Sequence, residues 1–154
     1  MDDWKKDLEI HFKEQKATKK EIEAHKESIK KHVKRFMKKE VLPAFEALEK
    51  ELKKYKRDVQ LDKKKDQAAL MIRRKKKKEF VYEINIRADG EELMANKSVY
   101  TPNKKGKLKL GVEGKISNLE NSPLLGNISR DDIVADFLTH YKESTSARTL
   151  VFFY

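Results

Sequence analysis

The sequence holds no cysteine, only 5 glycines and 3 prolines among 154 residues, and a hydrophobic fraction of 38%. Without cysteine the chain cannot form a disulfide framework, a thiolate zinc site or an iron–sulfur cluster, and it has no cysteine nucleophile. No apolar run approaches the ~18 residues that span a bilayer, and no apolar segment follows Met1. We therefore expect a cytoplasmic protein with no membrane partner.

Charged residues, by contrast, make up 41% of the chain, and the formal net charge is +11. The positive charge is concentrated in residues 67–109, which hold 12 basic and 5 acidic side chains. Most of the cations are lysines, which present point charges without the planar fork of arginine. The composition therefore favours contacts with phosphate backbones or acidic proteins over base-specific recognition. The alternative is a surface whose lysines serve solubility alone.

Two helices are expected in the N-terminal part of the chain. A short one is predicted over residues 4–12, where Trp4 and Leu8 are spaced to share a face. Thr18 and Glu21 then form a capping box, in which the two side chains satisfy early backbone N–H groups. This motif predicts that a long helix begins at residue 19.

The long helix is expected to cover residues 19–58, because one apolar stripe runs along them. Ile22, Val33 and Ala44 repeat every 11 residues, a period of about 3.67 residues per turn. The stripe keeps its phase across Pro43, so we expect a single helix that is kinked at or just before this proline. A helical hairpin at Pro43 is the alternative.

The length of this helix predicts self-association. About 40 residues give on the order of 60 Å of helix, whereas a compact domain of this size has a radius of gyration near 15 Å. Part of the apolar stripe must then overhang or pair with another chain, and we expect a homodimer. The residues expected to carry self-association are Ile22, Ile29, Val33, Met37, Val41, Leu48 and Leu52.

The domain organisation predicted is a helical, self-associating segment over residues 1–62 and an α+β domain over residues 63–154. Alternation of apolar and polar residues, clearest from Phe80 to Ile86, indicates half-buried strands. A turn is expected at Asp89 and Gly90. The predicted strands cover residues 67–72, 79–87, 97–100 and 106–116.

A second helix is predicted from a capping sequence at Ser129 to about Glu143. The last five residues, 150–154, are uncharged and have high β propensity, so we expect a terminal strand that is buried against the sheet. The alternative is a hook that adds a strand to the sheet edge of a partner. The fold class is therefore α+β, with a long kinked helix, a small antiparallel or mixed sheet of three to five strands, one later helix and a terminal strand.

The densest charge cluster lies between two predicted strands. Six consecutive cations repel one another, and a run of phosphates would relieve this repulsion and release counterions. The alternative is a solvated turn. Stacking of bases on Phe80 or Tyr82 would support a single-stranded ligand, but their alternation with Ile84 favours a place in the core. The candidate polyanion-binding residues are Arg73, Arg74, Lys75, Lys76, Lys77 and Lys78.

Three of the four histidines, His11, His25 and His32, share a heptad row with Trp4 and Thr18. Seven residues along a helix separate two rings by about 10 Å, which is too far for one helix to chelate a metal ion. We interpret the row as a polar flank of the helix. A metal-binding or pH-sensitive layer between paired helices is the alternative.

A second polar row lies on the later helix, where Asp132, Asp136 and His140 are spaced four residues apart. Such a row can serve a metal or acid–base site. Because the opposite side of this helix carries the apolar residues, we expect a solvated polar face instead. We accordingly expect no metal and no cofactor, and the sequence identifies no small-molecule substrate.

One enzymatic interpretation follows from Asp89 at the end of one predicted strand and Glu113-Gly114-Lys115 in a later strand. The arrangement resembles the D…ExK pattern of the PD-(D/E)xK nuclease superfamily, whose order of helix, three strands, helix and strand is similar to that predicted for residues 67–154. The resemblance implies that Asp89 and Glu113 hold Mg²⁺ while Lys115 stabilises the attacking water or the phosphate.

The sequence as a whole predicts a non-enzymatic basic protein that self-associates and binds a polyanionic partner, with nucleic acid preferred over an acidic protein. Under this interpretation no residue is catalytic. Two alternatives are kept: a protein-only adaptor or structural module, and a metal-dependent nuclease that uses Asp89, Glu113 and Lys115.

Overall fold

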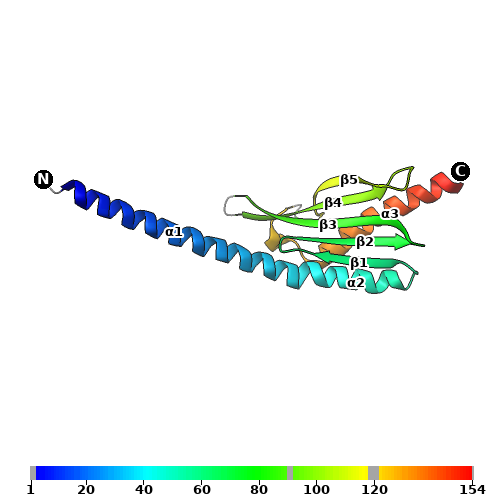
Figure 1. The fold of residues 1–154 in the computed structure, drawn as a ribbon. Helices are drawn as coiled ribbons and strands as arrows, with labels where there is room; N and C mark the ends of the chain where they lie inside the picture. Colours follow the sequence, from blue (N-terminus) through cyan, green and yellow to red (C-terminus); the bar gives the residue numbers. More distant parts are fainter. Residues whose placement is uncertain (1–2, 90–91, 118–121, 154) are drawn as a thin grey trace. The chain divides into compact units, whose positions relative to one another are not determined.

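The computed structural model describes residues 3–89, 92–117 and 122–153, with side chains up to Ser146 (Figure 1). The chain divides into two compact units, Met1–His32 and Val33–Tyr154. Residues 33–62, which the sequence groups with the helical segment, belong to the second unit. None of the helices in the described parts of the chain is both long and apolar enough to cross a bilayer.

The first unit is helical: α1 (Asp3–Phe36) begins at Asp3 and crosses the predicted break at residue 18. The capping box predicted at Thr18 is therefore wrong. The Thr18 hydroxyl donates to the Glu14 carbonyl of the preceding turn at 2.9 Å, which satisfies it inside a helix. No glycine or proline lies between residues 3 and 36 to end the helix, so the two predicted helices are one.

The helix continues into the second unit through one π-helical segment, η1 (Met37–Val41), to α2 (Leu42–Lys53). This confirms a single bent helix and excludes the hairpin. Pro43 has no N–H to donate, and the wider turn before it, in which the Leu42 N–H donates to the Met37 carbonyl, accommodates its ring.

The bent helix ends earlier than the predicted residue 58. Its last α-helical residue is Lys53, and Lys56 has a left-handed backbone with φ of 61° that reverses the chain. Residue 58, where the helix was predicted to end, is instead the first residue of β1 (Asp58–Lys63), a strand that the sequence did not predict.

Five strands form one sheet in the order β1-β2-β3-β4-β5, with every neighbouring pair antiparallel. The fold is α+β as predicted, and the sheet is antiparallel rather than mixed. The remaining strands are β2 (Gln67–Arg74), β3 (Lys77–Asp89), β4 (Glu92–Pro102) and β5 (Leu108–Lys115). The predicted turn at Asp89-Gly90 lies partly outside the described residues.

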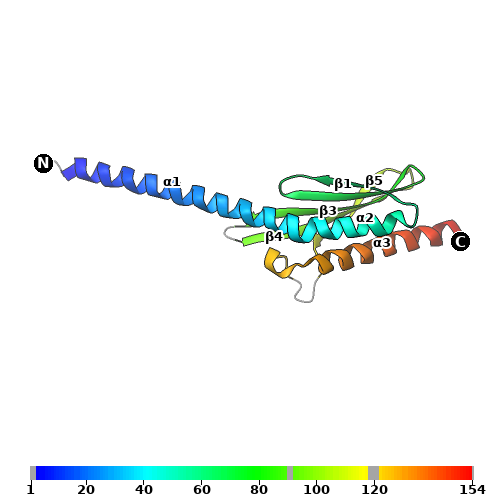
Figure 2. The ribbon, with the colours of Figure 1, turned by 90° about the horizontal axis from the view of Figure 1, so that it is seen from below.

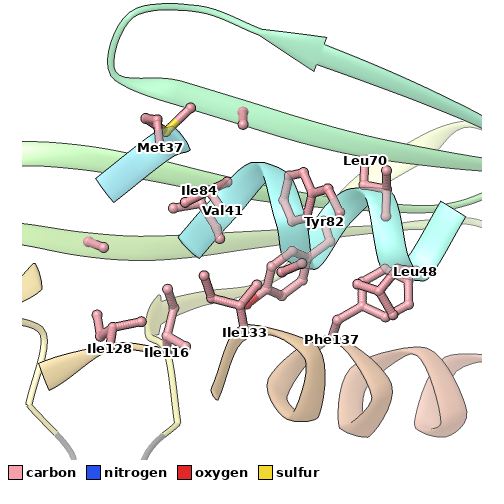
Figure 3. Close-up of a cluster of buried hydrophobic side chains, with 14 of the residues drawn as sticks. Met37, Val41, Leu48, Leu70, Tyr82, Ile84, Ile116, Ile128, Ile133 and Phe137 are labelled. Carbon is pink, nitrogen blue, oxygen red and sulfur yellow. The ribbon is translucent and has the colours of Figure 1, made fainter. Parts of the chain in front are cut away.

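Helices α2 and α3 (Arg130–Phe153) lie side by side on one face of the sheet (Figure 2). Alternate strand residues point at them: Leu70 pairs with Tyr82, which pairs with Val99, and all three are buried. Figure 3 shows this cluster, in which Met37 and Val41 from the bent helix meet side chains of the sheet and of α3. The buried state of Phe80 and Tyr82 confirms that both belong to the core.

The start of α3 is capped as predicted. The Asp132 N–H donates to the Ser129 hydroxyl at 3.2 Å, and the Ser129 N–H donates to the Asp132 carboxylate at 2.9 Å. A second cap comes from a distant segment, because the Arg130 N–H donates to the carboxylate of Glu40 at 2.5 Å. The bent helix thereby places an anion at the positive end of α3.

The predicted terminal strand is wrong. Helix α3 runs through residue 143, where the sequence placed its end, and continues to Phe153. Between these points the chain has no glycine or proline to stop helical hydrogen bonding, so the helix propagates into residues whose local preference is for strand.

Candidate functional site

One end of the sheet gathers basic residues from three separate parts of the sequence. Because the sheet is an antiparallel meander, the start of β1, the β2–β3 hairpin and the β4–β5 loop all lie at the same end (Figure 1). Four strand spacings make this end about 19 Å wide. We call it the basic end; its cations are Lys53, Lys54, Lys56, Arg57, Arg73, Arg74, Lys75, Lys76, Lys77, Lys78, Lys104, Lys105 and Lys107.

The β2–β3 hairpin carries the six cations predicted to bind a polyanion. Arg74 pairs with Lys77, so the loop consists of Lys75 and Lys76 alone. These two residues have φ of 51° and 68°, the left-handed conformation that two-residue hairpins of this kind require. Such turns favour glycine, which has no Cβ, and asparagine, whose side chain hydrogen-bonds locally, because the clash of Cβ with the following carbonyl oxygen costs roughly 1–2 kcal/mol per residue in this conformation.

The β4–β5 loop presents further lysines in an ordered turn. The side-chain carbonyl of Asn103 accepts the N–H of Lys105 at 2.9 Å and that of Lys107 at 3.0 Å. Gly106 takes a φ of 79° in the same loop. The backbone is thus fixed by Asn103, and the lysine side chains stay exposed to solvent.

Most cations of the basic end have no acidic partner. In the part of the chain that the structure describes, Lys56, residues 74–78 and the loop lysines 104, 105 and 107 form no ion pair. The buried Nε of Arg73 also has no hydrogen-bond acceptor among the described residues. Unpaired cations at this density leave the charge available for an external anion.

A polar cluster next to the basic end joins β3 to α3 and to the segment before β1. Glu79 is the extra residue of a β-bulge, since Ile72 pairs with Phe80 whereas Arg73 pairs with Lys78. Its carboxylate accepts hydrogen bonds from Arg57 Nε at 3.2 Å and from the Tyr141 hydroxyl of α3.

The titration of these groups follows from their contacts. Burial and the hydrogen bond to Glu79 raise the pKa of Tyr141 to about 12. Burial alone would lower the pKa of Arg57, but the hydrogen bond and charge of Glu79 outweigh it and raise that pKa. Arg57 therefore stays charged and anchors the loop that carries Lys56.

A second polar cluster lies between the sheet and α3, and the solvated polar face predicted there from the sequence is wrong. Asp136 is buried rather than part of a solvated face, with 2% of its surface exposed. Its carboxylate accepts hydrogen bonds from Lys97 Nζ and the Tyr82 hydroxyl, both at 2.6 Å, and from the Ser117 N–H at 3.3 Å. Lys97 lies in a strand and faces the apolar core. A buried lysine needs a buried counter-ion, so its place in the strand was the signal in the sequence that could have identified this pair.

The same cluster sets the titration of its neighbours. Burial, with the charge of Asp136, raises the pKa of Tyr82 well above its ordinary value, so its hydroxyl remains a donor. His140 Nε2 lies 3.6 Å from Asp136 Oδ1, which favours the charged ring. Burial and the Lys97 ammonium outweigh that attraction and lower the pKa of His140. The enclosed Lys97–Asp136 pair is thus a structural contact between β4 and α3.

The three residues of the nuclease interpretation do not come together. Lys115 pairs with Asn96, which pairs with Asn85, so Asp89 lies four residues further along β3. This separation is about 13 Å along the strand, in addition to two strand spacings. Glu113 lies further still from Asp89, and all three side chains are exposed.

The residues predicted to carry self-association divide between the two units. Ile22, in the first unit, is 50% exposed, and Ile29 is partly exposed. Val33 packs against the core of the second unit. The other four are buried in that core: Met37, Val41, Leu48 and Leu52. The sheet therefore covers the second half of the stripe, and the overhang argument applies only to residues before Val33.

No metal site emerges from the predicted polar rows. His11, His25 and His32 are exposed on α1. Among the residues that the structure describes, no three histidine, aspartate or glutamate side chains are grouped so as to hold a metal ion.

Comparison with protein-family models, curated proteins and solved structures finds no match to the chain.

Proposed function

We propose that this chain is a non-enzymatic, self-associating protein that binds the phosphate backbone of nucleic acid through the basic end of its sheet. The observation that carries the proposal is the hairpin tip, where Lys75 and Lys76 occupy two left-handed positions. Strained backbone positions cluster at functional sites, and here the two strained positions carry positive charge at the tip of a hairpin.

Charge density and its arrangement support a phosphate ligand. The basic end spans about 19 Å, and one strand of B-DNA presents a phosphate every 3.4 Å of helix axis. About five phosphates can therefore face it at once. Lysines dominate, so we expect affinity that depends strongly on salt and little on base sequence.

The experiment measures binding of a fluorescent random-sequence DNA duplex over a range of salt concentrations. Replacing Lys75, Lys76 and Lys77 with Gln should weaken binding and flatten the slope of log K against log salt by roughly two to three, since each lost phosphate contact removes about 0.9. The melting temperature should not fall, because these side chains are exposed and unpaired.

A matched control removes the same three charges from the opposite end of the sheet. Lys63, Lys64 and Lys65 lie at the β1–β2 turn and are exposed. Their replacement with Gln should leave the slope near that of the wild type. An equal loss in both variants would show that net charge alone drives binding, and an unchanged slope in the hairpin variant would leave the hairpin a solvated turn.

The adaptor alternative predicts a different result. Competition with polyglutamate separates the two, because counterion release from DNA depends on its closely spaced phosphates. If polyglutamate displaces the duplex at equal charge concentration, an acidic protein becomes the better candidate for the partner.

A further inference from the structure

The helix of residues 3–32 has an apolar side that nothing in its own unit covers. Trp4, Leu8 and Ile22 are 60%, 46% and 50% exposed. Its ion pairs, such as Lys13 with Glu9 at 3.4 Å, are exposed and add little stability. A helix of this length in water depends mainly on packing of its apolar face, so a partner for that face is required.

Three of the five large apolar residues exposed on this helix, Trp4, Leu8 and Ile22, follow a heptad pattern, whereas Ile10 and Phe12 lie outside it. Two rows seven residues apart run side by side along the helix, in the positions that coiled coils use for their a and d seam. Ile10 lies on the opposite side. The a row contains Leu8, Gln15, Ile22 and Ile29, and the d row contains Trp4, His11, Thr18, His25 and His32.

The flanks of this seam carry opposite charges. Three of the four g positions on one side are acidic, at Asp7, Glu14 and Glu21, and the fourth is Ser28. The e positions on the other side are the basic Lys5, Lys19 and Lys26 and the exposed Phe12. In a parallel pair, each g residue faces the e residue five places further along the partner. Glu14 would then face Lys19 of the partner subunit, and Glu21 would face Lys26 of the partner subunit.

An antiparallel pair would give the reverse. There g faces g and e faces e, so glutamates would oppose glutamates and lysines would oppose lysines. β-branched residues at a, as at Ile22 and Ile29, are typical of two-stranded coiled coils that carry leucine at d. The d row here has no leucine, so the charges on the flanks carry the argument for a parallel pair.

We infer that a second copy of this chain covers the face, in a parallel two-stranded coiled coil of residues 4–32 with Glu14–Lys19 and Glu21–Lys26 pairs between subunits. This inference deepens the self-association in the proposed function. The histidines and Thr18 in the d row weaken the seam relative to leucine, so association should be concentration-dependent rather than permanent.

Disulfide trapping tests the orientation, because the wild-type chain contains no cysteine. In the full-length chain, Leu8→Cys should form a covalent dimer under mild oxidation, since a parallel pair brings the two residues together. The matched control is Ile10→Cys, which lies on the opposite side of the helix and should remain monomeric on a non-reducing gel. Absence of a Leu8→Cys dimer, or equal trapping in both variants, would overturn the parallel arrangement.

Charge reversal tests the partner. Glu14→Lys with Glu21→Lys makes both flanks basic, and Lys19→Glu with Lys26→Glu makes both acidic. Each variant alone should self-associate at least about tenfold more weakly than the wild type. An equimolar mixture should restore the dimer, as measured by sedimentation equilibrium.

Circular dichroism of each variant shows whether the chain stays folded. A wild-type chain that sediments only as the 18.1 kDa species up to 100-fold above micromolar concentration would overturn the inference. DNA binding by the hairpin is measured separately at low protein concentration, so failure of the dimer leaves the test of the proposed function intact.

Discussion

At the scale of single residues, Lys75 and Lys76 adopt a left-handed backbone conformation that lysine disfavours. The hairpin would be more stable with asparagine and glycine, which adopt positive φ at low cost. We expect Lys75→Asn with Lys76→Gly to raise the free energy of unfolding by about 1 kcal/mol and to reduce the salt dependence of DNA binding. Urea denaturation and the duplex titration measure the two effects.

The opposite sign in either measurement would contradict this prediction. If the variant is less stable than the wild type, the left-handed backbone is not strained. If DNA binding is unchanged, the lysines at the tip do not contact phosphate. A variant with Lys75→Gln and Lys76→Gln is the control, because it removes the same charge and keeps side chains of similar length.

Asp136 is the second residue from which a stability prediction follows. Asp136→Asn removes the only carboxylate that pairs with Lys97 among the described residues, and leaves a buried ammonium without a counter-ion. Breaking a buried pair in this way costs about 3–5 kcal/mol. Adding Lys97→Met should recover part of that loss, because the remaining charge is removed. Urea denaturation measures both, with the exposed Asp131→Asn as a control that should change stability by only about 0.5 kcal/mol.

At the scale of elements, α3 is held to the sheet by its polar side as well as its apolar side, and this makes its attachment sensitive to acid. The pKa of His140 is lowered by burial and by the Lys97 charge. As the pH falls, the His140 ring is therefore protonated at a higher pH in the unfolded chain than in the folded chain. Stability from the neutral ring is complete above about pH 6.5 and declines below it, toward the lowered pKa.

We therefore expect the melting temperature of the wild type to fall from pH 7 to pH 5, and that of His140→Gln to fall less. The other three histidines are unchanged in the variant, so the difference between the two curves isolates His140. Tyrosine absorbance is a suitable probe, because the described tyrosines lie in the second unit whereas the single tryptophan lies in the first. Parallel curves would show that His140 does not titrate differently on folding.

The elements that could be predicted from the sequence were those whose pattern is local. Alternation identified β3, and the Ser129 capping sequence identified the start of α3, because each depends on residues a few positions apart. The end of α3 and the continuity of α1 could not be predicted. In both places local preference for a stop or a strand is weaker than continuation of helical hydrogen bonding.

The candidate site was predictable only in part, for a topological reason. The hairpin cations are consecutive in the sequence, whereas Lys56 and Lys104 join them only because an antiparallel meander returns to the same end. Likewise, Asp136 was predicted to be solvated because it lies opposite the apolar side of its helix, and its partner Lys97 is 39 residues away in the sequence. Contacts at such separations depend on strand register, which composition and periodicity do not specify.

At the scale of the whole molecule, a dimer carries two basic ends, and one long nucleic acid can contact both. Binding of the second end then becomes intramolecular, and avidity can exceed the affinity of one end by a factor of 10²–10⁴ when the ligand is long enough to reach both. A duplex that covers only one end, of about six base pairs, gains nothing from the dimer.

This predicts a variant that separates the two properties. Ile22→Ser with Ile29→Ser removes two of the three apolar a positions, leaving Leu8, without changing charge or touching the basic end. We expect it to be monomeric and to bind a 60-base-pair duplex at least about tenfold more weakly than the wild type, while binding to the short duplex is unchanged. Fluorescence anisotropy with both duplexes measures this at a protein concentration where the wild type is dimeric. Equal losses on both duplexes would place residues 3–32 within the binding surface itself, and no loss on either would mean that each end binds independently of the dimer.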